Sequence, residues 1–504
     1  MTASVEATTR GLIRSMLLTG SAQALSIILS IVRMKVLAVL LGPSGVGLFS
    51  IYVNLTEMIT QTAGLGMGSS GVREIASARG EEATLSRVRR VLFAAHLVQG
   101  TLALLAVWLL RLPISTWLFG DAAHATEVGL VGVAILLGLL AATQTALLQG
   151  LRHIGDLSRV TVFGAAAATA AGLGAVWGWG ELGLIWFLVA QPLATVLVAV
   201  YFTRQLPKPT SHRLTPQEIW HIWKPMARLG VAFMLGGIAT TGTLLLVRGR
   251  ISQELGLEAA GHFAAAWGIT MTYVGFLLSA MGTDYYPRLA EVIKNNAATS
   301  QLINDQMQLG LAIGGPILLL MLGWAPWIIH LFYSKEFDAA VSLLQWQTVG
   351  NVFKLAGWPL GFSNIAAGRA SIFFFSQISF NVIFLLIVWP TLGSVGIYSA
   401  GPAFITAYVV GFVINITLVR RYHSFRMEHQ SRVLLWLHAG LAVALLTLAL
   451  AVPIAAALAA PILALATGVF GLRVILAKLG LEGRVASRFA RLYAAIGWPI
   501  RSKP

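Results

Sequence analysis

One charged residue, Glu57, stands inside a long apolar stretch of the sequence. Asn54, Glu57 and Gln61 are three and four residues apart, so they share one face of a helix. An ionisable residue near the middle of a membrane-spanning helix costs about 2.5–3.5 kcal/mol on insertion scales, and such residues usually face a cavity or a partner. We therefore expect this stripe to face a polar cavity.

A second stripe of the same kind contains a lysine. Gln347, Asn351, Lys354 and Trp358 recur at helical spacing within another apolar stretch. The two stripes together predict a water-filled cavity that both of them line. The alternative is a buried ion pair between Glu57 and Lys354 that only holds helices together. We favour the cavity, because whole stripes are polar rather than single positions.

Four further cations stand near the outer ends of two other apolar stretches, at Arg33, Lys35, Arg248 and Arg250. Such a group suits an anionic substrate such as a pyrophosphate, because arginine can bind it through two parallel hydrogen bonds. Residues two apart on a helix point about 200° apart, so one of each pair should face elsewhere. We expect Arg33 and Arg248 to face the cavity, and Lys35 and Arg250 could instead extend to the membrane interface.

Two short charged motifs stand at the predicted cytoplasmic ends of helices. One contains Arg73 and Glu74, and the other contains Asp284 and Arg288. They could form an inner gate whose salt bridges open and close. The alternative is that tyrosine and arginine anchor these helix ends at the membrane interface.

The composition excludes most other classes of protein. Of 504 residues, 57% are hydrophobic and only 11% are charged, against about 25% charged in a soluble domain. The absence of cysteine excludes disulfides and thiol catalysis, and the ten histidines lack metal-ligand spacing. There is no Walker A motif, so we expect no ATP and no other cofactor. The glycines of residues 66–71 match a dinucleotide fingerprint but follow no strand, so close helix packing explains them better.

The hydropathy pattern predicts an all-α, polytopic membrane protein with about fourteen transmembrane helices. They are expected near residues 15–40, 45–70, 90–110, 128–150, 159–179, 183–203, 226–250, 261–285, 307–330, 341–366, 371–390, 395–419, 434–455 and 458–477.

The net charge of +16 is concentrated on one side of this predicted topology. With a cytoplasmic N-terminus, 28 of the 35 basic residues fall in cytoplasmic segments. This bias predicts an even number of helices with both ends inside. It also explains the positive charge without a nucleic-acid partner.

An internal repeat divides the chain. Residues 42–49 (GPSGVGLF) align with residues 256–263 (GLEAAGHF) at an offset of 214. We predict two six-helix lobes, at 1–210 and 211–425, around a central cavity. Residues 426–504 would add two helices and a basic amphipathic tail on the inner leaflet, or in solvent. Repeated halves are typical of secondary transporters. The tail pattern places Leu481, Val485, Phe489, Leu492 and Ile496 on the apolar face.

Five stretches of the sequence resemble bacterial O-antigen and enterobacterial-common-antigen lipid flippases, which belong to the multidrug/oligosaccharidyl-lipid/polysaccharide exporter superfamily. They are residues 35–48 (KVLAVLLGPSGVGL), 71–76 (GVREIA), 284–289 (DYYPRL), 334–337 (SKEF) and 345–354 (QWQTVGNVFK). Related flippases often carry Asp where this chain has Asn351. The resemblance therefore does not identify which carboxylate of this chain, if any, takes part in ion coupling.

The resemblance implies a secondary transporter of the bacterial inner membrane rather than an enzyme. Its activity would be to flip undecaprenyl-pyrophosphate-linked repeat units of O-antigen type to the periplasmic leaflet by alternating access, for lipopolysaccharide and related polysaccharide synthesis. A gradient of H⁺ or Na⁺, or the membrane potential, would drive it. Membrane lipids, a polysaccharide polymerase and a chain-length regulator are the partners it implies.

Three alternatives remain. A multidrug or cation exporter of the same superfamily would share the fold, although the four cations favour an anionic substrate. A polytopic polysaccharide ligase or polymerase would need large periplasmic segments, and the predicted outer loops are short. A scaffold in the polysaccharide assembly complex is the third.

Overall fold

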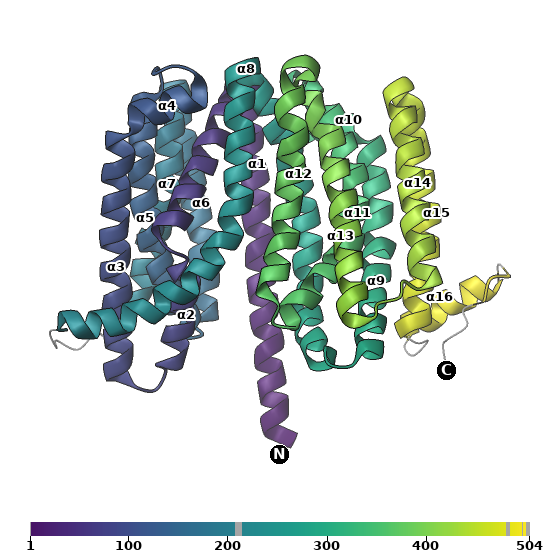
Figure 1. The fold of residues 1–504 in the computed structure, drawn as a ribbon, viewed down its shortest axis with the longest axis horizontal. Helices are drawn as coiled ribbons and strands as arrows, with labels where there is room; N and C mark the ends of the chain where they lie inside the picture. The colour runs from purple at the N-terminus through teal and green to yellow at the C-terminus, as the bar shows by residue number, and fades with distance from the viewer. Residues whose placement is uncertain (1, 207–213, 480–483, 496, 500–504) are drawn as a thin grey trace. The chain divides into compact units, whose positions relative to one another are not determined.

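The structure is a computed structural model that describes residues 2–206, 214–479, 484–495 and 497–499. These residues form helices joined by short connections, with no strand among them (Figure 1). The prediction of an all-α chain is therefore confirmed.

Nine segments of the described chain are long and apolar enough to cross a membrane. Four of them, Gly20–Ala63, Ile154–Thr203, Met234–Gly282 and Ser371–His423, have 44, 50, 49 and 53 residues. A single crossing needs about 20 residues, so each of these is long enough for two. If each of the four long segments counts as two helices, the nine segments give thirteen. The more polar helix α11 (Asp338–Ala366) is the fourteenth, which matches the number that the sequence predicts.

Each of the four long segments is broken at a glycine. Gly42, Gly180, Gly256 and Gly396 have φ values of 62°, 57°, 86° and 70°. Residues with a Cβ rarely adopt this region, so glycine allows the chain to turn sharply between two helices. Gly42 and Gly256 are equivalent in the sequence repeat, and their ψ values of −166° and 170° give them the same kink.

The contacts divide the chain into two units. Unit 1 comprises residues 1–264 and the short segment Phe332–Glu336. Its elements are α1 (Thr2–Ala63), α2 (Met67–Ser77), α3 (Glu82–Leu109), α4 (Arg111–Phe119), α5 (Ala125–Gly150), α6 (Ile154–Trp179), η1 (Gly180–Leu182), α7 (Gly183–Thr203) and the first part of α8 (Pro216–Val292).

Unit 2 comprises Ala265–Leu331 and Phe337–Pro504. It contains the rest of α8, then α9 (Asn296–Gly323), α10 (Ala325–Phe332) as far as Leu331, α11, α12 (Ala370–Val395), η3 (Gly396–Ser399), α13 (Ala400–His423), α14 (His429–Ala451), α15 (Pro453–Leu479) and α16 (Arg484–Ala495). The short helix η2 (Lys335–Phe337) belongs to unit 1 except for Phe337. The lobes predicted from the sequence repeat, 1–210 and 211–425, have other boundaries than these two units. A repeat in sequence and a division by spatial contacts are different criteria, so the predicted lobes stay a prediction.

Small residues bring helices of unit 1 together where α1 ends. A methyl group on Gly66 would lie 2.1 Å from the carbonyl oxygen of Gly230, so the two backbones touch. Gly71 packs in the same way against Leu92. This confirms that residues 66–71 serve helix packing. The helix expected over 45–70 is interrupted here, because Leu65 and Gly66 have φ values of 47° and 63°.

The two helices beyond the predicted lobes, α14 and α15, pack on α9 within unit 2. The Asn304 side chain of α9 donates to the Arg426 carbonyl and accepts from the Glu428 N–H, both at 2.9 Å. A methyl group on Gly315 would strike the His438 ring of α14 at 2.2 Å. These contacts fasten the added helices to α9. The predicted amphipathic tail forms α16, while Leu481 and Ile496 lie outside the described residues.

Candidate functional site

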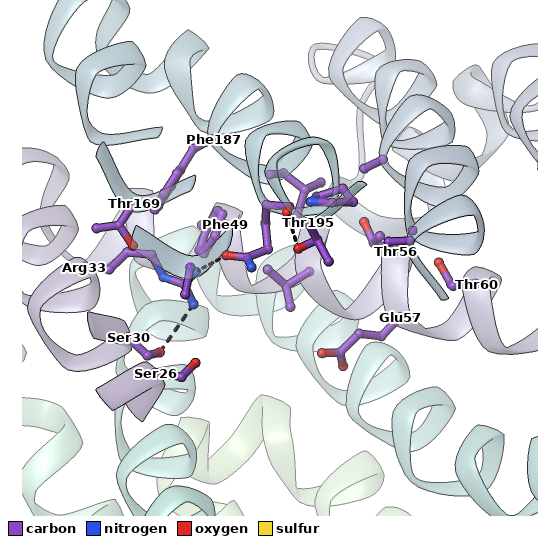
Figure 2. A pocket seen from close by; sticks show the side chains of 18 of the residues that line it. Ser26, Ser30, Arg33, Phe49, Thr56, Glu57, Thr60, Thr169, Phe187 and Thr195 are labelled. Atoms are coloured by element: carbon purple, nitrogen blue, oxygen red, sulfur yellow. Dashed lines mark hydrogen bonds between the residues drawn. The ribbon is translucent and has the colours of Figure 1, made fainter. Parts of the chain in front are cut away.

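A chamber of about 460 Å³ lies inside unit 1, among α1, α5, α6 and α7 (Figure 2). It contains two of the residues predicted to line a cavity, Arg33 and Glu57. The other side chains around them are mainly hydroxyl-bearing or apolar, and the polar ones are Ser26, Ser30, Thr56, Thr60, Thr169, Gln191 and Thr195.

The kink of α1 at Gly42 gives the chamber two walls from a single helix. Pro43 has no N–H to continue the helical ladder, and Gly42 supplies the turn. Arg33 comes from the part of α1 before the kink and Glu57 from the part after it. Figure 2 shows these two side chains apart from each other in the chamber, and they do not form an ion pair.

Arg33 is held at the chamber wall by three neighbours. Its guanidinium donates to the Gln191 side chain of α7 at 3.1 Å and to the Ser30 hydroxyl at 3.3 Å. It also lies 5.6 Å from the centre of the Phe187 ring. These contacts fix the orientation of a charge that faces the chamber.

Asn54 and Glu57 connect the chamber wall to Arg248 on α8. Arg248 is 7% exposed, and its guanidinium donates to the Asn54 side chain and, at 3.0 Å, to the Ser50 carbonyl. Glu57 and Arg248 attract each other electrostatically. Gln61, the third residue of the stripe, accepts a 3.4 Å hydrogen bond from Thr241 of α8.

Glycines let α8 approach α1 closely enough for these contacts. A methyl group on Gly47 would lie 2.1 Å from the Leu257 carbonyl oxygen, and one on Gly261 would lie 1.9 Å from that of Pro43. Both glycines belong to the sequence repeat. The two copies of the repeated motif therefore touch each other within unit 1.

The other member of each predicted cation pair has a partner of its own. Lys35 donates to the backbone carbonyl of Tyr333, and Arg250 forms an ion pair with Glu254 one turn along α8. Neither Lys35 nor Arg250 is among the residues that line the chamber. Arg248, which was expected to face the cavity, does not line this chamber either, because its guanidinium is buried against Asn54 and Ser50.

The second predicted stripe lies on α11 in unit 2. The Lys354 ammonium contacts the Met271 sulfur at 3.3 Å and lies 5.3 Å from the centre of the Tyr408 ring. Asn351 is fully buried, and neither of its amide atoms has a hydrogen-bond partner among the described residues. Gln347 accepts from Thr270 at 2.8 Å.

Trp358, the last residue of this stripe, packs in an aromatic cluster. Its ring centroid lies 5.7 Å from that of Tyr285 and 4.6 Å from that of Phe362.

The residues proposed as an inner gate belong to different units. Arg73 and Glu74 lie on α2 of unit 1, where Arg73 is exposed. Asp284 and Arg288 form an ion pair with each other, 3.0 Å long and one turn apart on α8. A gate that joins the two motifs stays a prediction.

Charged residues within apolar stretches predict only part of the chamber lining, because most of the lining residues are uncharged. Gln191 is the partner of Arg33, and it is an uncharged polar residue in the middle of the apolar helix α7. A search for amides within apolar stretches, beside the search for charges, would have found it. The hydroxyl residues of the wall give no such signal, because serine and threonine are common in membrane helices.

Comparison with known proteins relates the chain to polysaccharide synthesis. A family described as "Polysaccharide biosynthesis protein" matches residues 12–293. The lipid III flippases of Escherichia coli (strain K12) and Shigella flexneri are each 24% identical to the chain over 392 residues. The aligned parts cover 75% of this chain and 91% of those proteins.

Solved structures of low sequence identity share the fold. The inward closed conformation of the lipid II flippase MurJ matches with a TM-score of 0.67 and 12% identity, over 91% of this chain and all of that one. An inward-facing transporter of the multidrug resistance MATE family, from the MOP superfamily, matches with a TM-score of 0.65 and 15% identity. That alignment covers 79% of this chain and 96% of the transporter.

Proposed function

Because the chain belongs to the family of polysaccharide biosynthesis proteins, we propose that it is a flippase for a lipid-linked oligosaccharide. The observation that carries the proposal is its similarity to the lipid III flippases over 91% of their length. The substrate would be an undecaprenyl-pyrophosphate-linked oligosaccharide, moved from the cytoplasmic to the periplasmic leaflet of the inner membrane. Both termini would then be cytoplasmic, with a polymerase and a chain-length regulator as partners.

We assign the cations of each unit to the anionic part of this substrate. Arg33 of unit 1 and Lys354 of unit 2 would each act on the pyrophosphate and sugars, while the prenyl chain stays in the lipid. Arg248, which is buried and donates to Asn54 and Ser50, would hold α8 against α1. Arginine forks and amides such as Gln191 suit phosphate and sugar oxygens. Glu57, whose carboxylate is accessible from the chamber, would couple substrate movement to an H⁺ or Na⁺ gradient or to the membrane potential.

The test is a flipping assay with purified protein. Vesicles contain a lipid-linked oligosaccharide in both leaflets, and an enzyme that cannot cross the membrane modifies the outer copies. We expect the wild-type protein to expose the inner copies, whereas vesicles without protein keep them protected. In cells, Glu57→Gln and Lys354→Ala should each stop surface polysaccharide display at protein levels equal to wild type. Full display in both variants would contradict the residue assignment.

A multidrug exporter is the second candidate, because the fold also matches MATE transporters. Export of cationic dyes by cells that keep normal surface polysaccharide, together with no movement of the lipid in vesicles, would favour this function. Ligation or polymerisation of glycan by the purified protein would instead favour an enzyme.

A further inference from the structure

The chain after α15 folds back onto that helix within unit 2. α16 is terminated by Gly497, whose φ of 74° is the left-handed conformation typical of helix ends. The Trp498 N–H donates to the Tyr493 carbonyl at 2.9 Å across this turn. Trp498 thereby stacks on Phe470 of α15, with ring centroids 6.0 Å apart. The end of α16 is therefore fixed on α15 rather than free.

Two further contacts hold α16 at the same level of α15. The Tyr493 hydroxyl donates to the Val469 carbonyl, and Tyr493 is 4% exposed. The Arg473 guanidinium donates to the Pro499 carbonyl at 3.2 Å and lies 4.5 Å from the centre of the Trp498 ring. These contacts on α15 therefore fall within residues 469–473.

This level coincides with the expected boundary between lipid and water. Residues 453–472 of α15 contain no charged side chain, and Arg473 is the first one. At about 1.5 Å per residue, these 20 residues span roughly 30 Å, which is the thickness of the hydrocarbon core. Tyrosine and tryptophan are enriched at this boundary, and here Tyr493 and Trp498 lie there.

The side chains of α16 divide into two faces. Tyr493 points to α15, and the exposed residues Phe489 and Leu492 continue the apolar face beyond it. Arg488 and Arg491 are exposed and, at about 100° per residue, lie about 140–160° around the helix from Tyr493, with Leu492 at the border between the two faces. A helix with this division lies in the plane of the interface, with its apolar face in the acyl region and its cations at the phosphates.

The C-terminal segment of the chain is strongly basic. Residues 473–504 contain seven Lys or Arg residues and a single acidic residue, Glu482. We propose that α16 is a docking surface for anionic phospholipid, with Arg488 and Arg491 bound to headgroup phosphates and Phe489 and Leu492 inserted beneath them. This inference does not depend on what the protein transports.

A single fluorescent label can test this surface, because the sequence contains no cysteine. Ala495→Cys, in the full chain, takes an environment-sensitive dye at an exposed position of α16. The labelled protein is reconstituted into vesicles of phosphatidylcholine alone or with phosphatidylglycerol. We expect a blue shift of the emission with phosphatidylglycerol that weakens as the salt concentration rises from about 0.15 M to about 1 M.

Replacement of the two arginines separates lipid binding from mere packing on α15. Arg488→Gln with Arg491→Gln should weaken the response to phosphatidylglycerol by about 30-fold in apparent affinity, while lysine at both positions should keep it. Arg420→Gln with Arg421→Gln, an equal loss of charge at exposed positions at the end of α13, should leave it unchanged.

Three results would overturn the proposal. One is an equal emission in both kinds of vesicle, and another is an undiminished response in the double glutamine variant. The third is a response to soluble polyglutamate without one to phosphatidylglycerol, which would point to an acidic protein partner.

Discussion

In unit 1 the buried guanidinium of Arg248 donates to Asn54 and Ser50 and is attracted by Glu57. In unit 2 the Lys354 ammonium has a thioether and an aromatic ring as neighbours, and no carboxylate among the described residues pairs with it. Each unit thus carries a buried cation inside a membrane segment, but Arg248 has an opposite charge nearby and Lys354 has none among the described residues.

The difference indicates different roles for the two cations. A buried charge without an opposite charge is costly, and a protein tolerates this cost where the charge is needed for function. A cation that has its hydrogen-bond acceptors and lies outside the chamber, as Arg248 does, contributes mainly to structure. We therefore expect Lys354 to act on the substrate and Arg248 to hold α8 against α1.

The largest expected effect comes from Lys354→Met. Methionine keeps much of the volume and removes the charge, so the variant should be as stable as wild type or up to about 1–3 kcal/mol more stable. Flipping of the anionic lipid should fall at least about 30-fold, because a buried charge contact to the substrate is lost. The flipping assay in vesicles and thermal unfolding in detergent measure the two effects. Lys354→Arg should keep most of the activity, and a clear loss of stability in Lys354→Met would show that the lysine is structural.

The glycine contacts offer a second comparison between the units. In Gly47→Ala the new methyl group meets a backbone carbonyl of α8, which cannot move without shifting the helix, so we expect a loss of about 2–3 kcal/mol. In Gly315→Ala the methyl group meets the His438 side chain of unit 2. We expect about 1 kcal/mol here, because displacing a side chain costs less than shifting a helix, although the buried His438 ring is held by its hydrogen bond with the Leu434 carbonyl.

Unfolding in detergent measures both glycine variants. A second substitution, His438→Ala, should restore part of the stability of Gly315→Ala by making room for the methyl group. Equal losses in the two glycine variants would contradict the distinction between backbone and side-chain contacts.

The sequence predicted the helices well because apolar length and glycine are local signals. The kinks at Gly42 and Gly256 were not predicted as such, although the repeat paired these two residues. Arg33 and Glu57 were predicted as cavity residues because a charge in an apolar stretch is conspicuous, and both line the chamber of unit 1. The larger cavity lined by both polar stripes stays a prediction. An amide within an apolar stretch marks Gln191 as a candidate, but its pairing with Arg33 depends on how α7 packs against α1, and no local pattern contains that information.

The electrostatic attraction between Glu57 and Arg248 provides the smallest and most specific test of the comparison. Glu57→Gln removes the negative charge and leaves Arg248 with neutral acceptors. We expect a loss of about 1–2 kcal/mol, which is less than for a fully enclosed pair because the chamber admits water to Glu57. In the double variant with Arg248→Met the uncompensated positive charge is also gone. The double variant should therefore lose less stability than the sum of the losses of the two single variants. A double-mutant cycle on unfolding in detergent measures this coupling. Strict additivity would mean that Arg248 is held by Asn54 and Ser50 alone, and unit 1 would then resemble unit 2 in carrying a cation without a counter-charge.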